Sequence, residues 1–445
     1  MYKDSCIKEA RDGSKCGVAY YLTIFFVGHL LYGFGGFMES SYYKNAKNCV
    51  VSTLRGNRCT FEELCRKCHG LYPTVIRNII SELKIHETLI PVYTTDQNSI
   101  PLDAFDDRYY ESHDNVTEQI QNNPILSSWY FSWNTCGKIA SIDIWKNKSV
   151  LFLGTPRLFE YFITRNYGKE LTLIDLDELV VSSLRKKYCD SAHKSLFFCC
   201  KNITTINIEE LNSQIPRVYD YVFLDPPWYL ESYGAWLDVA LKFTHSSSSI
   251  VFSLFPSLLR PSAMVERKDI LDRCRDVATK VQLFPDYLEY DIPSFEKGEL
   301  VMEGLLLRSS WKMADMVVLT TPKGNSYKRH SFSAEEYSMW REFNFFDYRW
   351  FFNQSFSTND DLPVVSAPLG TLYLKSPSKR NPEFGRVNLL SSRGHGLLVS
   401  NSLLFFKAIS EIQSQTSKDA ICKIIQDLDI DDESKHIFYK LMEER

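Results

Sequence analysis

The sequence has no excess of basic residues. Its 445 residues contain 51 Lys and Arg against 55 Asp and Glu, which gives a formal net charge of −4 at pH 7. This balance excludes a globally basic, histone-like nucleic-acid binder, although it is compatible with a local basic groove. Gly and Pro are also scarce, with 19 and 17 residues, while hydrophobic residues make up 44%. A collagen-like or mainly disordered chain is therefore excluded, and the length predicts two to four globular domains.

Regular cysteine spacing is absent as well. The twelve cysteines are scattered along the chain, and two of them, Cys199 and Cys200, are adjacent. Reduced thiols in a cytoplasmic protein fit this distribution better than a disulfide framework. The cluster that comes nearest to a zinc site lacks the usual pair-plus-pair spacing: Cys59, Cys65, Cys68 and His69. We therefore expect no metal site.

A single apolar run is long enough for a membrane span. Residues 17–37 carry no charge and follow several basic residues, but their glycines and tyrosines make the hydrophobicity moderate. Met38 follows directly. Our first interpretation is that Met38 is the true start and that residues 1–37 are an upstream read-through. A buried core helix ranks second and a membrane anchor third, and only the anchor would imply a membrane partner.

Residues 38–95 predict a winged-helix domain. Thr60, before two glutamates, predicts a helix N-cap, and Pro73 predicts the first turn of a second helix. The inner face of that helix is apolar: Val75, Ile76, Ile79, Ile80 and Leu83. Its outward residues could dock DNA: Arg77, Asn78 and Lys84. Winged helices also serve as dimerisation or protein-contact modules, so a protein partner remains the alternative.

After a polar linker over residues 96–125, the stretch 126–310 alternates short apolar runs with helical segments. The runs are 149–154, 171–176, 195–200, 219–228, 249–255, 278–284 and 300–307. This rhythm predicts a parallel sheet with helices on both faces, closed by an antiparallel pair. Seven strands in this arrangement make a Rossmann-like sheet of the S-adenosylmethionine (SAM) methyltransferase type. Ligands of such sheets bind at the carboxyl ends of the strands.

Candidate cofactor residues stand at three of these ends. Gly154 ends the first run, where a closely packed nucleotide cofactor needs a residue without a side chain. Asp175 ends the second run, where a carboxylate can accept both ribose hydroxyls, and Asp177 is the alternative. Asn202 follows the third run and could contact the cofactor adenine or serve only as a turn residue.

The most specific motif is Asp225-Pro226-Pro227-Trp228, at the end of the fourth run. An amino group on a planar ring is a poor nucleophile because its lone pair is delocalised. The Asp225 carboxylate and the Pro226 carbonyl can both accept hydrogen bonds from that group, which lets the nitrogen become pyramidal. The prolines fix the backbone, and Trp228 or Tyr229 can stack on a base that has been flipped out of a duplex. A plain surface turn is the alternative, which the apolar flank disfavours.

Here the chain resembles a known family. Residues from about 126 to 310 resemble the N6-adenine methyltransferases, a grouping that includes zinc-knuckle ribosomal-RNA adenine methyltransferases and elongation-factor lysine methyltransferases. The matching segments are WYFSWNT (129–135), LFLGTPRLFEYF (151–162), LIDLDE (174–179) and DPPWY (225–229). The resemblance implies SAM as cofactor and an acceptor amine at Asp225 to Trp228. It places these residues near the cofactor: Ser132, Thr135, Gly154, Thr155 and Pro156.

Departures from the family pattern leave alternatives open. The loop GTPR after the first run lacks the usual Gly-x-Gly, and zinc-knuckle cysteines are missing. Trp228 is similar to the aromatic residue of messenger-RNA adenine methyltransferases. A winged helix before such a domain is also similar to branched-polyamine aminopropyltransferases, which use decarboxylated SAM. Their acidic first loop is absent and GTPR is basic, so we rank polyamine substrates lower.

The remaining candidates lie towards the carboxyl end. Residues 290–299 fall between the last two predicted strands, so the acceptor side could include Tyr290, Phe295 and Glu296. Residues 311–445 predict a smaller α+β accessory domain. Its aromatic stretch 335–356, with Arg341 and Arg349, could stack single-stranded nucleic acid, but a core segment is favoured. Lys379 and Arg380 could contact phosphate, with a solvated loop as the alternative.

Three functional hypotheses follow. The first is an N6-adenine methyltransferase that acts on DNA or RNA, with nucleic acid as the expected partner. The second is a protein-lysine methyltransferase of the same superfamily or a polyamine aminopropyltransferase-like enzyme. The third is a catalytically inactive binding module, which a SAM pocket blocked by Arg157 or Phe159 would favour.

Overall fold

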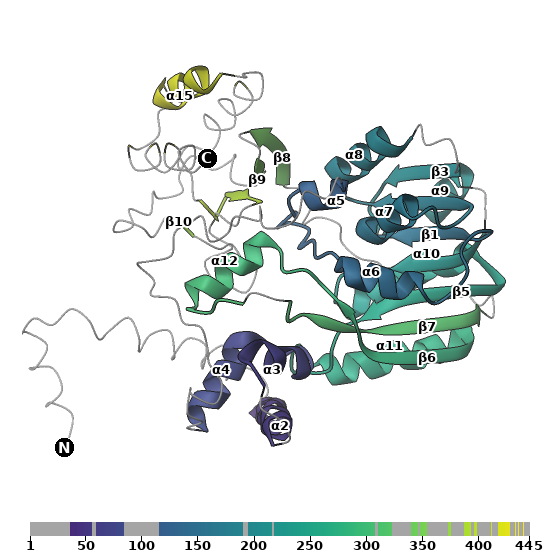
Figure 1. Cartoon of the computed structure of the whole chain (residues 1–445), viewed down its shortest axis with the longest axis horizontal. Coiled ribbons are helices and arrows are strands. Elements are labelled where there is room, and N and C mark those ends of the chain that lie inside the picture. The colour runs from purple at the N-terminus through teal and green to yellow at the C-terminus, as the bar shows by residue number, and fades with distance from the viewer. Residues whose placement is uncertain are drawn as a thin grey trace, which may run out of the picture.

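The predicted seven-stranded sheet is present in the computed structural model (Figure 1). Its strand order is β3-β2-β1-β4-β5-β7-β6, and β7 is antiparallel to both of its neighbours. The strands are β1 (Ser149–Leu153), β2 (Glu170–Asp175), β3 (Ser195–Cys200), β4 (Tyr219–Leu224), β5 (Thr244–Leu254), β6 (Ala278–Glu289) and β7 (Met313–Pro322). This order is a Rossmann-like sheet of the methyltransferase type. The structure describes residues 36–55, 59–83, 115–189, 195–215, 218–307, 310–322, 340–345, 348–353, 373–374, 387–392, 396–397, 411, 417–427, 432, 435 and 439.

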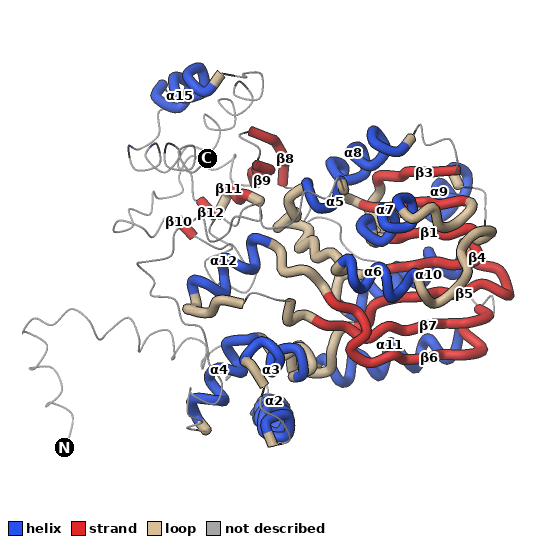
Figure 2. Tube along the Cα trace, viewed as in Figure 1, coloured by secondary structure: helices blue, strands red, loops and turns tan. Residues whose placement is uncertain are grey.

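Helices cover both faces of the sheet (Figure 2). Side chains alternate along a strand, so Val150 and Phe152 of β1 face one set of helices and Leu151 and Leu153 face the other. The first set is α6 (Trp133–Ala140), α7 (Pro156–Thr164) and α8 (Glu178–Tyr188), with the short α5 (Val116–Gln119) beside them. The second set is α9 (Ile208–Gln214), α10 (Leu230–Lys242) and α11 (Ala263–Val277). Burial on both faces explains why the strands are continuous apolar runs.

The seventh strand was placed wrongly by the sequence pattern. Residues 300–307, predicted as a strand, lie at the end of helix α12 (Ser294–Met302) and in the turn after it, where Gly304 adopts a φ of +75°. The strand that closes the sheet is β7, so the predicted boundary at residue 310 cuts off its last strand. A short apolar run cannot by itself distinguish a buried helix from a strand. Here Leu300 and Leu305 are buried against the amino-terminal helices and not in the sheet.

Three helices precede the sheet: α2 (Gly36–Leu54), α3 (Phe61–Lys67) and α4 (Pro73–Glu82). The predicted N-cap is confirmed, because Thr60 and Glu63 form a reciprocal capping box, and Pro73 opens α4 as expected. The apolar faces of α3 and α4 pack against Leu258 and Trp311 of the sheet domain. The wing expected between residues 84 and 95 lies outside the described residues, so the winged helix stays a prediction.

In the described part of the chain, no helix is both long and apolar enough to cross a membrane. Residues 1–35 lie outside that part, as do residues 96–114 of the predicted linker. The three interpretations of residues 17–37 therefore stay predictions.

A second, antiparallel sheet lies in the carboxyl-terminal part. Its strand order is β10-β12-β11-β9-β8, with β8 (Trp340–Phe345), β9 (Tyr348–Asn353), β10 (Tyr373–Leu374), β11 (Leu389–Ser391) and β12 (Gly396–Leu397), and helix α15 (Lys418–Asp427) follows. The described residues of the aromatic stretch form the paired antiparallel strands β8 and β9. Its rings at Phe343, Trp350, Phe351 and Phe352 are buried, so the core interpretation is confirmed over a stacking platform.

Candidate active site

The loops after β1, β2 and β4 meet at one edge of the sheet. These strands are adjacent and parallel, so their carboxyl ends lie together, at the point where the strand order reverses. The loops are also bonded to neighbouring strands. Gly154 N donates to Ile174 O at 2.9 Å, and Asp225 N donates to Leu153 O at 3.2 Å. The sequence prediction that Gly154, Asp175 and Asp225 share one edge is therefore confirmed.

Gly154 is required by its surroundings. Its φ is +63°, and a Cβ atom there would lie 2.5 Å from the ring of Trp236. Trp236 Nε1 in turn donates to Thr204 Oγ1 at 3.2 Å, and Thr204 N donates to Asn202 Oδ1 at 3.0 Å. Asn202 is thus a turn residue that supports the wall behind Gly154, although it was also a candidate for adenine contact.

The loop after Gly154 has an unsatisfied polar group. Thr155 stands at the N-cap of α7 and Pro156 occupies its first turn. The Thr155 hydroxyl is buried and has no hydrogen-bond partner among the described residues. Buried polar groups normally have partners, so this orphaned hydroxyl fits a loop that receives a polar ligand.

Arg157 and Phe159 are both committed to protein partners. The Arg157 guanidinium is buried, forms an ion pair with Asp291, and donates to the carbonyl of Phe131 at 3.1 Å. Phe159 lies fully buried with its ring edge-on to Phe152 at 5.5 Å between centroids. The basic character of GTPR is thereby neutralised by Asp291.

Of the two candidate ribose ligands, the structure favours Asp175. Its Oδ1 accepts a hydrogen bond from Asp177 N at 2.8 Å, and burial raises its pKa to about 7. Asp177 is nearly inaccessible: it caps helix α8 through Val180 N and forms a bidentate ion pair with Arg349, both contacts at 2.8 Å. The alternative that Asp177 binds ribose is therefore wrong, because its carboxylate is already occupied.

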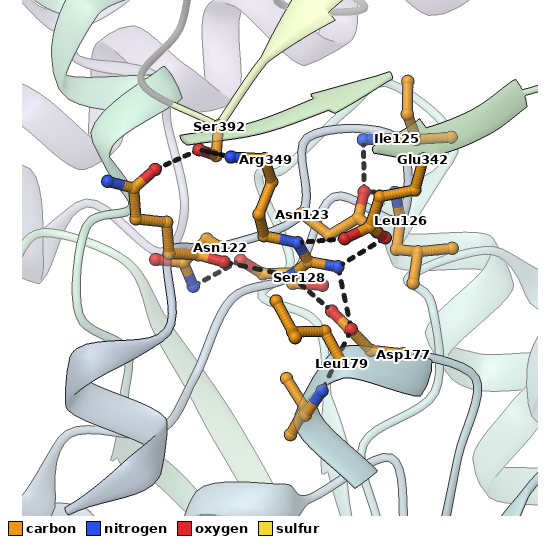
Figure 3. A network of polar contacts seen from close by, with 12 residues as sticks. Asn122, Asn123, Ile125, Leu126, Ser128, Asp177, Leu179, Glu342, Arg349 and Ser392 are labelled. Atoms are coloured by element: carbon orange, nitrogen blue, oxygen red, sulfur yellow. Dashed lines mark hydrogen bonds and ion pairs between the residues drawn. The ribbon is translucent and has the colours of Figure 1, made fainter. Parts of the chain in front are cut away.

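Arg349 links the second sheet to the edge of the first sheet at which Asp175 lies (Figure 3). It lies on β9 with 3% of its surface exposed, and it binds Asp177, both oxygens of Glu342 at 2.9 Å and the carbonyl of Gln121 at 3.0 Å. A fully paired buried guanidinium is a fixed part of the fold. Sequence reasoning noticed this arginine only as a partner for stacked bases, and no local signal identified Asp177 as its partner 172 residues away.

Ser132 and Thr135 bind the backbone at the end of β6. Ser132 caps helix α6, and its N donates to Glu289 O at 2.8 Å. Thr135 is fully buried, and its hydroxyl accepts from Glu289 N at 2.8 Å. The contacts of both residues fasten the segment before β1 to the end of β6. Cofactor contact by Thr135, which the resemblance implied, does not agree with this burial.

Two hydroxyl groups hold Asp225 in place. Its Oδ1 accepts hydrogen bonds from the hydroxyls of Ser253 and, at 2.7 Å, Tyr290. Burial raises its pKa to about 6, while these two hydrogen bonds and the charge of Lys312 act to lower it. Its Oδ2 has no hydrogen bond among the described residues. One oxygen is therefore fixed by the protein and the other is available to an acceptor.

The rest of the motif adopts a tight turn. Pro226 is buried, and the Pro227 carbonyl accepts from Tyr229 N at 2.7 Å. Trp228 lies edge-on to Tyr290 at 5.6 Å between ring centroids. Tyr229 is 55% exposed and points instead towards Arg260, so of the two candidate stacking rings Trp228 is the one beside Asp225.

Of the residues expected on the acceptor side, Tyr290 is the one that the structure brings to Asp225. Phe295 and Glu296 lie buried in α12. Lys379 and Arg380 are outside the described residues, and their phosphate contact stays a prediction. No group of three metal-binding side chains occurs among the described residues.

Sequence reasoning missed two residues that act on Asp225: Ser253, which donates a hydrogen bond to it, and Lys312, whose charge lowers its pKa. Ser253 lies inside a recognised strand, β5, where alternation would have pointed it to one face only. Lys312 precedes β7, the strand that was misplaced. Its Nζ lies 3.7 Å from the ring centroid of Trp129 and 4.2 Å from that of Trp228.

The amino-terminal helices contact the segments that follow β5 and β6. Leu258 N, just after β5, donates to His69 O at 2.9 Å, and Arg66 binds both the Ser310 carbonyl at 2.6 Å and Glu289 at 3.1 Å. Arg77 donates to the carbonyl of Glu303 and is partly buried. The prediction that it faces outward to contact DNA is wrong, because α4 packs this face against the end of α12. Asn78 is exposed, and Lys84 lies outside the described residues.

Comparison with known proteins gives only structural likenesses. No protein-family model matches the chain, and no curated protein matches it. The branched-chain polyamine synthase C9 mutein from Thermus thermophilus, solved with N4-aminopropylspermidine and 5′-methylthioadenosine, is 10% identical, with a TM-score of 0.48 over 66% of this chain and 91% of that chain. An rRNA methylase from Streptococcus thermophilus is 8% identical, with a TM-score of 0.28 over 45% of this chain and 98% of that chain. The N-methyltransferase NodS from Bradyrhizobium japonicum is 11% identical, with a TM-score of 0.27 over 45% of this chain and 99% of that chain. The class of fold therefore rests on the strand order of the protein itself.

Proposed function

We propose that this protein is a SAM-dependent methyltransferase that acts on an exocyclic ring amine, N6 of adenine in DNA or RNA. The observation that carries the proposal is the geometry of Asp225: its Oδ1 is held by Ser253 and Tyr290, and its Oδ2 is left for an acceptor. Trp228, beside it, supplies a ring on which a planar base can stack.

The edge formed by Gly154, Thr155 and Asp175 would hold the cofactor. Asp175 can accept the two ribose hydroxyls, Gly154 permits close approach of the backbone, and the orphaned Thr155 hydroxyl can donate to a polar group. SAM, when bound, supplies a methyl group that is activated by a positively charged sulfur.

The acceptor side would orient the amine without a strong base. Asp225 Oδ2 and the Pro226 carbonyl each accept a hydrogen bond from one N–H group of a neutral ring amine. These two bonds draw the nitrogen lone pair out of conjugation with the ring. With a pKa of about 6, Asp225 is mostly ionised at neutral pH and acts as an acceptor. Once the nitrogen carries the methyl group it is a strong acid, and Asp225 or water can take its proton.

The proposed nucleic-acid partner would present a flipped or single-stranded base. Lys379 and Arg380 remain candidates for phosphate contact, and a protein partner for the amino-terminal helices remains a separate proposal. A cytoplasmic location stays a prediction from the cysteine pattern.

A second candidate is transfer to an aliphatic amine, either a lysine side chain or a polyamine. One observation favours it: the arginine that made the GTPR loop basic is paired with Asp291, so the charge argument against a cationic substrate no longer applies at that loop.

Titration of the full chain with SAM and S-adenosylhomocysteine tests the cofactor site. We expect micromolar binding that Asp175→Ala weakens strongly and that Asp225→Asn leaves intact. Labelled methyl from SAM should then reach DNA or RNA with wild type and not with Asp225→Asn. Absence of binding at millimolar cofactor would overturn the methyltransferase proposal and favour an inactive binding module, whereas labelling of protein or polyamine would favour the second candidate.

A further inference from the structure

A lysine ammonium is held among three aromatic rings beside Asp225. Lys312 Nζ lies 3.7 Å from the ring centroid of Trp129, 4.2 Å from that of Trp228 and 5.5 Å from that of Tyr290. The aromatic residues come from three separate segments: the stretch before α6, the motif after β4, and the loop after β6. Cation–π attraction to several ring faces stabilises an ammonium in place.

The backbone fixes this ammonium on the acceptor side. Lys312 is the residue before β7, and its carbonyl accepts from Tyr290 N at 3.1 Å. The Tyr290 hydroxyl binds Asp225, and Trp228 belongs to the acceptor motif itself. The charge of Lys312 also acts on the Asp225 carboxylate and lowers its pKa. An acceptor amine that approaches Asp225 must therefore approach Lys312 as well.

This arrangement distinguishes two kinds of amine by charge. An aliphatic amine has a pKa near 10.4 and is protonated at neutral pH, so it would bring a second ammonium next to Lys312. The carboxylate of Asp225 carries one negative charge and can balance one ammonium, and like charges at short range in a partly buried site repel strongly. A ring amine is neutral at the same pH. Its ring nitrogens can accept a hydrogen bond from an ammonium, and its π-face can lie against Trp228.

We propose that Lys312 is a specificity-determining residue that excludes protonated aliphatic amines from the site and favours a neutral ring amine with a neighbouring ring nitrogen. This inference rests on the proposed function, because it names the substrate class of the same site. Trp129 and Tyr290 serve as positioning residues that hold the ammonium.

The test compares two probes on three full-length proteins. Binding of 9-methyladenine and of spermidine is measured by titration calorimetry in the presence of S-adenosylhomocysteine, on wild type, Lys312→Met and Lys312→Arg. Binding that Asp225→Asn weakens is assigned to the acceptor side. Methionine keeps an unbranched side chain against the rings without its charge, and arginine keeps the charge, so Lys312→Arg is the matched control for folding and packing.

We expect wild type and Lys312→Arg to bind 9-methyladenine and to reject spermidine. Lys312→Met should bind 9-methyladenine about tenfold more weakly, the size of one lost hydrogen bond to a charged group, and should gain spermidine binding at least about tenfold. Equal selectivity in Lys312→Met and wild type would overturn the inference. So would a wild type that binds spermidine as well as 9-methyladenine, or one that binds neither probe.

The outcomes separate this inference from the proposed function. If S-adenosylhomocysteine does not bind, but the probes still show selectivity that depends on Lys312, then the methyltransferase proposal fails. The inference that Lys312 excludes protonated amines stands. If the cofactor binds and methyl transfer occurs, but spermidine or lysine is the better acceptor, the inference about Lys312 fails. The protein is then still a methyltransferase, and its substrates are aliphatic amines.

Discussion

The Tyr290 hydroxyl donates a 2.7 Å hydrogen bond to Oδ1 of Asp225, and the two residues are 65 positions apart in the chain. The bond joins the motif after β4 to the loop after β6. Because it stabilises the ionised carboxylate, it opposes the burial that raises the pKa of Asp225 to about 6. Among the residues that the structure describes, the other carboxylate oxygen accepts no hydrogen bond, and this is the oxygen that we propose for the acceptor amine.

Replacing Asp225 by Asn should abolish most methyl transfer while leaving cofactor binding intact. The amide keeps the size of the side chain but loses the charge and one acceptor, so we expect a rate about 10²–10³-fold lower, comparable to the removal of one preorganised polar group in other active sites. Asp272→Asn, at an exposed position on α11, is the control and should leave the rate unchanged. Full activity in Asp225→Asn would show that the motif does not bind the acceptor amine.

Replacing Tyr290 by Phe should shift the pH dependence of the reaction. The hydrogen bond from Tyr290 lowers the pKa of Asp225, so its loss raises that pKa, and activity that needs the ionised carboxylate is lost at a higher pH as the solution is acidified. We expect the acidic limb, near pH 6 in wild type, to move up by about one unit. Tyr287→Phe, which removes a hydroxyl that donates to the Lys138 carbonyl, is the matched control. An unmoved acidic limb in Tyr290→Phe would contradict the assignment.

Replacing Arg349 by Met should destabilise the protein and weaken cofactor binding together. The change leaves Asp177 buried without its partner, which typically costs about 3–5 kcal/mol of the free energy of unfolding. Asp177 N donates to Asp175, so the cofactor edge should loosen, with a Kd for SAM about tenfold higher. Arg341→Met, on the neighbouring strand at an exposed position, should change stability by less than about 0.5 kcal/mol. Unchanged SAM affinity in folded Arg349→Met would separate the second sheet from the cofactor site.

Asp175→Asn should increase stability above neutral pH and reduce SAM affinity. The pKa of Asp175 is about 7 in the folded protein and about 3.9 in an unfolded chain, so the folded state binds this proton more tightly and loses stability as the pH rises from about 4 to about 7. Removing the carboxylate removes that loss, which for a difference of about three pKa units is at most about 4 kcal/mol at pH 8 and is reduced by the partial exposure of Asp175. Thermal unfolding between pH 5 and 8 measures it. A difference between the proteins that is the same at every pH would refute the assigned pKa.

Gly154→Ala should destabilise the loop after β1. The backbone there has a φ of +63°, and the new Cβ atom would press on Trp236, so we expect a loss of about 1–3 kcal/mol and weaker SAM binding. Gly137→Ala in helix α6 is the control: its Cβ meets only the end of the Tyr161 side chain, at 3.3 Å, and alanine favours a helix. Equal stability of the two variants, measured by denaturant unfolding, would contradict the steric argument.

Much of the central fold could be predicted because parallel strands buried on both faces leave a local signature. Within β1 and β4 the segments VLFL (150–153) and YVFL (221–224) are apolar without interruption, and a helix follows each strand. The misplaced last strand shows the limit of that signature. Residues 300–307 are as apolar as β7, and only packing against the amino-terminal helices makes them part of a helix and a turn.

The same distinction between local and long-range signals applies to the site residues. Gly154, Asp175 and the Asp225 motif could be identified because each directly follows a recognisable strand, and the carboxyl ends of parallel strands must meet at one edge. Most of their partners could not be identified. Tyr290 was expected on the acceptor side because its segment falls between two predicted strands. Ser253, Lys312 and Arg349 reach the site from positions with no local pattern, since a hydrogen bond or ion pair between distant segments imposes no periodicity on either one.

Most strands and helices, and the chemistry of the acceptor motif, follow from the sequence alone, because backbone preferences and apolar periodicity act over a few neighbouring residues. Three features depend on the tertiary packing: which aspartate is open to a cofactor, the neutralisation of Arg157 by Asp291, and the position of a lysine ammonium among the rings beside Asp225. These outcomes depend on distances between segments that are remote in sequence, and such distances are set by the packing of the whole chain.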